Sequence, residues 1–161
     1  MRNRALILAN YCKKITSDWL IKTYNLTDEL SWSVGELYEF NILRELIIDT
    51  LENNNLMQNI EKVNYYLSTA SFKHNIMVSN NKIIHYHTSD DSINEQLMSK
   101  IASDLIKLFN NSTSKGIKRC LNPECKMYFV DNSKNNSKKY CSSRCNNLIK
   151  VRRFREKNGH E

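Results

Sequence analysis

Four cysteines near the carboxyl end of the chain have the residue type and the spacing of a metal site. They form two short pairs with fifteen residues between them: Cys120-x4-Cys125 and Cys141-x3-Cys145. Structural zinc sites take four thiolate or imidazole ligands in a tetrahedron, and two short pairs supply them with only one longer loop to order. We expect the first pair on a turn bent by Pro123 and the second pair on one face of a helix.

Disulfide bonds are the competing interpretation of these cysteines. The first apolar stretch, residues 5–9, is too short for a secretory signal and soon turns polar. No apolar run has the length of a membrane span. These patterns favour a cytoplasmic protein whose thiols stay reduced. The sequence therefore predicts one structural Zn²⁺ per chain, bound by all four cysteines.

Three histidines form a second group with metal-ligand chemistry. Residues 72–78 and 82–88 are rich in β-forming side chains and flank Asn80-Asn81, which predicts a hairpin. In that register His74 lies opposite His87, and His85 shares their face. The group is either a second metal or ligand site or one face of a half-exposed sheet, and we favour the sheet face.

Catalytic motifs are missing from the sequence. It contains no Gly-rich phosphate loop, no nucleophile motif and no His-Glu pair at zinc-hydrolase spacing. His160 lies too near the chain end to be expected in an ordered site. The fifth cysteine, Cys12, falls in an apolar stripe and is expected to be a small buried side chain. We therefore expect a protein that is not an enzyme.

Helices should position most of these residues, because the 161 residues include only 3 Gly and 1 Pro. Apolar spacing predicts helices over residues 5–24, 36–53, 56–68, 92–109 and 141–157. Ser33-x-x-Glu36 and Ser92-x-x-Glu95 are capping boxes. The expected fold class is α+β and mostly helical. Residues 1–114 would form a helical domain with a β-hairpin, and residues 115–161 a small four-cysteine zinc-binding module that ends in a helix.

The charge of the chain is divided unevenly between these two parts. Residues 1–114 hold 11 Lys or Arg and 13 Asp or Glu, whereas residues 115–161 hold 13 and 4, for net charges of −2 and +9. A basic segment of this kind favours binding to an anionic polymer. A solvated, solubilising tail is the alternative, but such a tail would not need metal-dependent folding. We therefore expect the partner to be a nucleic acid, with DNA favoured over RNA.

The last helix is expected to carry the contact surface. At 100° per residue, Cys145, Leu148 and Ile149 group on a side that faces the metal and the core. The opposite side carries Asn146, Lys150, Arg153 and Lys157. The complete set of expected nucleic-acid-binding residues is Lys138, Lys139, Arg144, Asn146, Lys150, Arg152, Arg153, Arg155 and Lys157. If about five cations meet phosphates, log K should fall with log salt at a slope of about −4 to −5.

The module resembles the CGNR zinc finger. The resemblance rests on Cys120-x4-Cys125-x3-Phe129-x-Asp131-x-Ser133, on Tyr140-Cys141-x3-Cys145-x-Asn147, and on Lys150 and Phe154-Arg155. The namesake Cys-Gly-Asn-Arg stands here as Cys145-Asn146-Asn147-Leu148, so the ligand cysteine is kept and the glycine and arginine are lost. In that family the finger ends bacterial proteins whose N-terminal ABATE domain is described as a stress-induced transcriptional regulator.

The resemblance implies a zinc-dependent DNA-binding protein that regulates transcription in bacteria. Residues 1–114 are similar to the ABATE domain in order and length, and would sense a small-molecule effector or form a homodimer. Two alternatives remain. The module could be an adaptor that docks on an acidic protein partner, or it could bind RNA with Tyr128 or Phe129 stacked on bases. Neither alternative involves catalysis or a membrane.

Overall fold

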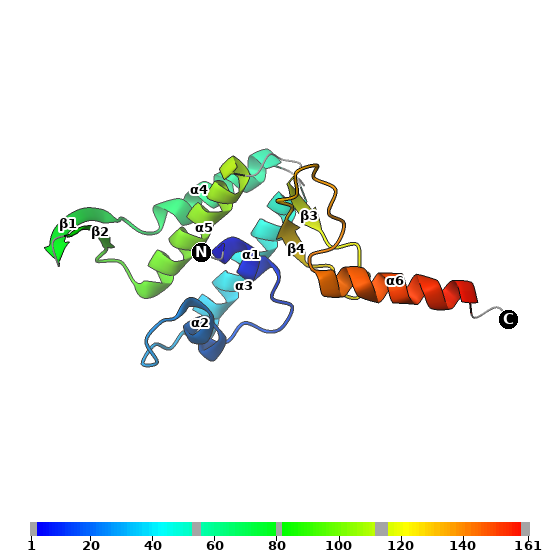
Figure 1. Ribbon diagram of the computed structural model, residues 1–161. Helices are drawn as coiled ribbons and strands as arrows, with labels where there is room; N and C mark the ends of the chain where they lie inside the picture. Colours follow the sequence, from blue (N-terminus) through cyan, green and yellow to red (C-terminus); the bar gives the residue numbers. More distant parts are fainter. Residues whose placement is uncertain (1–2, 53–55, 80–81, 112–115, 159–161) are drawn as a thin grey trace. The chain divides into compact units, whose positions relative to one another are not determined.

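A computed structural model describes residues 3–52, 56–79, 82–111 and 116–158 (Figure 1). The elements, in chain order, are α1 (Arg4–Ala9), α2 (Ser17–Tyr24), α3 (Val34–Leu51), α4 (Leu56–Ser68), β1 (Lys73–Ser79), β2 (Lys82–Thr88), α5 (Ile93–Asn111), β3 (Ile117–Arg119), β4 (Tyr128–Val130) and α6 (Ser143–Asn158). The described residues thus form helices and two small antiparallel sheets, which confirms the predicted mostly helical α+β class.

The chain divides into two compact units, Met1–Ile106 and Lys107–Glu161. This division falls inside α5, whereas the sequence places a boundary between residues 114 and 115. Residues 112–115, which flank the expected boundary, lie outside the described residues. No helix in the described ranges is both long enough and apolar enough to cross a membrane.

The first unit begins with two helices, α1 and α2, in place of the single helix predicted over residues 5–24. Asn10 caps the end of α1, and the Thr16 side chain accepts a hydrogen bond from the Trp19 N–H at the start of α2. The Thr16 side chain thus offers the backbone an alternative to a continuous helix. The predicted stripe therefore belongs to two helices, and Cys12, in the link between them, is exposed rather than buried.

Two capping boxes begin α3 and α5, as predicted. The Ser33 N–H donates to Glu36 Oε2 at 2.8 Å, and the Glu36 N–H donates back to Ser33 Oγ at 3.2 Å. Ser92 and Glu95 repeat the arrangement at 3.0 and 3.3 Å. Each box satisfies backbone donors that the first helical turn leaves unpaired. The sequence could specify these helix starts because capping is local.

The core of the first unit lies among its helices. Its fully buried large side chains are Leu8, Ile15, Leu20, Phe40, Leu43, Ile47, Val63, Ile101 and Leu105. Polar contacts fasten the helices around this core. Arg4 Nη1 pairs with Asp104 Oδ2 at 3.0 Å and joins α1 to α5. Ser99 Oγ donates to the Leu67 carbonyl at 3.1 Å and joins α5 to α4.

The β1–β2 hairpin has the predicted register. His74 pairs with His87, and Ile76 pairs with His85. The predicted turn, Asn80-Asn81, and the side chains of the three histidines lie outside the described residues. The preference for a sheet face over a second metal site therefore stays a prediction.

Candidate metal centre and basic helix

The first cysteine pair lies on the turn between β3 and β4. Cys120 follows β3 directly, and its N–H donates to the Met127 carbonyl at 2.8 Å. The Cys125 N–H donates to the Asn122 carbonyl at 3.0 Å, which closes the turn around Pro123. Two strands of three residues each are enough to fix this turn because their backbone bonds continue into it.

The second cysteine pair lies at the start of α6. The helix begins at Ser143, and Ser142 caps it by accepting the Cys145 N–H at 3.3 Å. Cys141 therefore precedes the helix, and the prediction that both cysteines share a helix face is wrong. A serine at this position favours a cap over another turn of helix. Cys145 lies in the first turn, where the helix dipole favours a thiolate.

The four sulfur atoms lie together. All of them are within 4.8 Å of one another, with Cys125 and Cys141 Sγ atoms 3.6 Å apart and Cys141 and Cys145 Sγ atoms 3.7 Å apart. Zn–S bonds of about 2.3 Å place tetrahedral ligands about 3.8 Å apart. A disulfide needs sulfurs about 2.05 Å apart. The cluster therefore fits one structural zinc ion, as predicted, and four protein ligands complete its shell.

A small apolar cluster encloses the sulfurs. Cys120 and Cys145 are buried, and Phe129 packs against them together with the partly buried Tyr140. Phe129 therefore packs on the metal site. The shell limits access of water and competing ligands to the thiolates, which stabilises a structural site.

The surroundings of Cys145 and Cys141 shift the pKa values of their thiols in opposite directions. Asn122 Nδ2 donates to Cys145 Sγ at 3.6 Å, and this bond, followed by one from Ser142, lowers the pKa of Cys145 to about 7. Burial, followed by the neighbouring thiols of Cys125 and Cys145, raises the pKa of Cys141 to about 12. A bound zinc ion would hold all four sulfurs as thiolates, since its charge offsets burial and mutual repulsion.

Asp131 organises the long loop between the cysteine pairs. Its carboxylate is shielded from solvent and accepts from Lys118 Nζ at 2.6 Å, the Ser133 N–H at 2.9 Å and the Lys138 N–H at 2.8 Å. Burial raises the pKa of Asp131, but hydrogen bonds from Lys118, Ser133 and Lys138 outweigh this effect and hold it well below its usual range. Lys118 also donates to the Asn136 carbonyl. One buried carboxylate thus joins β3, β4 and the loop.

The expected nucleic-acid-binding residues fall into three groups. The first, which we call the basic row, runs along one side of α6 at 100° per residue. It consists of Asn146, Lys150, Arg153 and Lys157. Asn146 is half-buried, and the three cations are exposed. The row extends about 16 Å along the helix axis.

The second group consists of the arginines on other sides of α6. Arg144 and Arg155 are exposed and, by the helical repeat, lie opposite the basic row. Arg152 Nη2 pairs with Glu124 Oε1 at 2.6 Å, so it ties the helix to the first cysteine turn. The structure therefore does not gather all the predicted cations on one surface.

The third group, Lys138 and Lys139, lies beside the start of α6. Both residues line a groove of about 290 Å³ together with Ser142 and Asn146. Lys138 Nζ also lies 5.7 Å from the centre of the Phe129 ring, a cation–π contact. Because Asn146 belongs to both the groove and the basic row, the two form one continuous surface.

The structure contradicts one alternative and one expectation about apolar side chains. Tyr128 and Phe129 are each only 8% exposed, so neither ring is available to stack on a nucleic-acid base. Leu148 is 50% exposed, although the predicted helix face placed it in the core. Both differences arise because the module is small: its apolar centre holds the strand rings and cysteines, and only the first turn of α6 reaches it.

Residues 117–158 match the model of the CGNR zinc finger family. The match covers all four cysteines and the whole basic row. It confirms the resemblance of the module, and it assigns the cluster to a zinc-finger site. The likeness of the N-terminal part to the ABATE domain stays a prediction. No curated protein matches the chain.

Three residues of the centre had no role assigned from the sequence, although Asp131 is part of the motif that resembles the CGNR zinc finger. Asn122 contacts a ligand sulfur, Ser142 caps the helix that holds Cys145, and Asp131 binds the loop. Local signals for two of them were present. Asn122 precedes a proline in a turn, and Ser142 precedes a helical segment. The partners of Asp131 were not readable, because they converge only in three dimensions.

Proposed function

We propose that this chain is a zinc-dependent DNA-binding protein that acts as a bacterial transcriptional regulator. The single observation that carries the proposal is the position of α6. The helix starts at the four-cysteine cluster through Cys145 and then extends with every residue from Lys150 to Asn158 exposed. Zinc would fix the start of this helix, and its cations would be free to meet phosphates.

The dimensions of the basic row suit a duplex backbone. A row about 16 Å long matches about five phosphates of one strand, which are spaced about 3.4 Å along the axis. The adjoining groove adds Lys138 and Lys139 to the same surface. The N-terminal unit would then supply regulation, by sensing an effector or by homodimerisation, in a cytoplasmic protein without catalytic activity.

DNA affinity should depend on zinc and on salt. In fluorescence anisotropy with a random duplex, we expect binding by the zinc-loaded protein and a log K against log salt slope of about −4 to −5. Zinc removal should abolish this binding. Absence of zinc-dependent binding at low salt would count against the proposal.

A matched pair of triple variants distinguishes the contribution of the basic row to DNA affinity from the contribution of net charge. Lys150→Gln, Arg153→Gln and Lys157→Gln together should reduce the magnitude of the salt slope by about 3. The control replaces Lys13, Lys14 and Lys22 of the N-terminal unit by glutamine, with the same change in net charge. Equal losses of affinity in the two proteins would show that only net charge matters.

One observation favours an alternative, an adaptor that docks on an acidic protein. Leu148, Val151 and Phe154 on α6 are 50, 48 and 66% exposed, and apolar side chains of this kind suit a protein partner. Under that function, duplex DNA would fail to displace the protein partner.

A further inference from the structure

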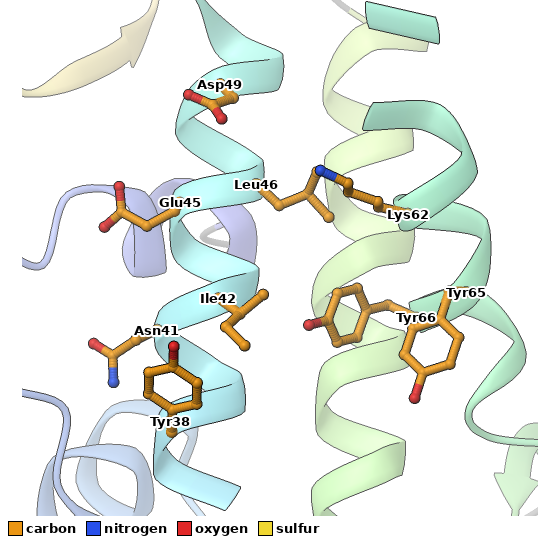
Figure 2. Close-up of a pocket in the computed structure, with 9 residues that line it drawn as sticks. All are labelled: Tyr38, Asn41, Ile42, Glu45, Leu46, Asp49, Lys62, Tyr65 and Tyr66. Carbon is orange, nitrogen blue, oxygen red and sulfur yellow. The ribbon is translucent and has the colours of Figure 1, made fainter. Parts of the chain in front are cut away.

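A groove lies between α3 and α4 of the N-terminal unit, and the DNA-binding proposal uses none of its lining residues (Figure 2). Its volume of about 420 Å³ falls in the range of small-ligand pockets. The α3 side is lined at helical spacing from Tyr38 to Asp49, and the α4 side by Lys62, Tyr65 and Tyr66. One face of each helix therefore builds the groove.

The floor of the groove is apolar and its edges are aromatic. Figure 2 shows Ile42 and Leu46 projecting from α3 toward α4, with the Tyr66 ring projecting from α4 toward α3. Leu46 and Tyr66 are buried, whereas Tyr38 and Tyr65 are each 65% exposed. Two exposed rings beside an apolar floor can cover the flat or aliphatic body of a small molecule.

The charges around the groove are mainly negative. Glu45 and Asp49 line it from α3. The Tyr66 hydroxyl donates to Glu39 Oε2 at 3.2 Å, which brings a third carboxylate to its edge. Burial, followed by the Glu39 charge, raises the pKa of Tyr66, so the phenol stays protonated. Lys62 is the cation that lines the groove.

The three carboxylates are not equally available. Glu45 Oε1 accepts from Arg44 at 3.2 Å, and Glu39 is occupied by the Tyr66 hydroxyl. Asp49 is exposed and has no hydrogen-bond or ion-pair partner among the described residues. It is therefore the carboxylate best able to receive a positive charge from a ligand.

We propose that this groove binds a small organic cation, namely an ammonium group on an aromatic or aliphatic body. The ammonium would lie near Asp49 and Glu45, and the apolar body would lie over Ile42 between the exposed tyrosine rings. Tyrosine faces also attract cations directly. This site goes beyond DNA binding, and would give the N-terminal unit an effector.

Three phenyl compounds of similar size test the charge of the ligand. In isothermal titration calorimetry of the full chain, phenethylammonium should bind, 2-phenylethanol should bind several-fold more weakly, and phenylacetate should bind least. Binding of the neutral or anionic probe at least as tight as that of the cation would overturn the proposal. Failure of the cation to bind at millimolar concentration would also overturn it.

Point variants test whether the cation binds in the groove. Asp49→Asn should weaken phenethylammonium binding about three- to fivefold, the range of an exposed charge contact. Asp28→Asn, an equal charge change at an exposed site outside the groove, should leave binding unchanged. Tyr65→Phe should retain affinity and Tyr65→Ala should lose it, while Lys62→Gln should tighten binding. Equal effects of Asp49→Asn and Asp28→Asn would show non-specific attraction and refute the site.

Discussion

At the scale of single residues, Asp131 joins several segments of the zinc module without binding the metal. Its buried carboxylate receives hydrogen bonds from Lys118 Nζ and from the Ser133 and Lys138 backbone. A buried charge with several donors is stabilising only while every donor remains paired. The loop between the cysteine pairs therefore depends on one side chain that binds no metal.

Replacement of this carboxylate should loosen the module. Asp131→Asn replaces one accepting carboxylate oxygen with an N–H₂ group, which only donates, so a buried donor that pairs with that oxygen loses its acceptor. We expect a lower thermal midpoint of the zinc-loaded module and faster zinc loss to a chelator. Circular dichroism and a colorimetric zinc assay measure these effects. Asp28→Asn is the control, and an equal response of the two variants would contradict this role.

At the scale of elements, local capping determines where the helices begin. Ser33 and Glu36 exchange hydrogen bonds at the start of α3, and hydrogen bonds from the Ser33 side chain and backbone lower the pKa of Glu36. Because the folded-state pKa is depressed, the stabilisation is present above the unfolded pKa of Glu36, about 4.3, and is lost as the pH falls through the folded value.

Removal of this cap should destabilise the first unit in a pH-dependent way. Ser33→Ala should lower its free energy of unfolding by about 1 kcal/mol at pH 7. The difference from wild type should narrow as the pH falls below the unfolded pKa of Glu36 and through its lower folded-state pKa. Denaturant titrations at several pH values measure this. Ser31→Ala, at a nearby exposed site, is the control, and a pH-independent penalty would contradict the role of Glu36.

At the scale of the whole molecule, two units with different sources of stability share one chain. The first buries aliphatic and aromatic side chains among its helices, whereas the second buries little beyond its cysteines and strand rings. A core as small as the second does not supply enough hydrophobic free energy alone, so metal binding must supply the rest.

Metal removal should therefore unfold only the second unit. Structural zinc contributes about 10–16 kcal/mol in finger peptides, so a chelator should expose 107–161 to proteolysis and leave 1–106 resistant. Cys141→Ser should act in the same way without a chelator. Limited proteolysis with mass spectrometry identifies the protected fragment. Simultaneous loss of both units would show that they fold as one.

The sequence by itself determined the features whose causes are local. Cysteine spacing specified the zinc ligands, two Ser-x-x-Glu motifs specified helix starts, and β-forming runs specified the hairpin register of His74 and His87. In each case the interacting residues are close in the chain or chemically unambiguous. Apolar spacing wrongly predicted one helix over residues 5–24, where the structure has two. The spacing alone does not show which polar residues will cap a helix end.

Only the tertiary structure decided how distant segments meet. It placed the donors around Asp131, paired Arg152 with Glu124, buried Tyr128 and Phe129, and formed the groove between α3 and α4. These arrangements depend on packing between elements, where a side chain becomes buried or exposed according to what space the neighbouring elements leave. Residue type and helical period fix the side of a helix on which a residue lies, but not whether another element covers that side.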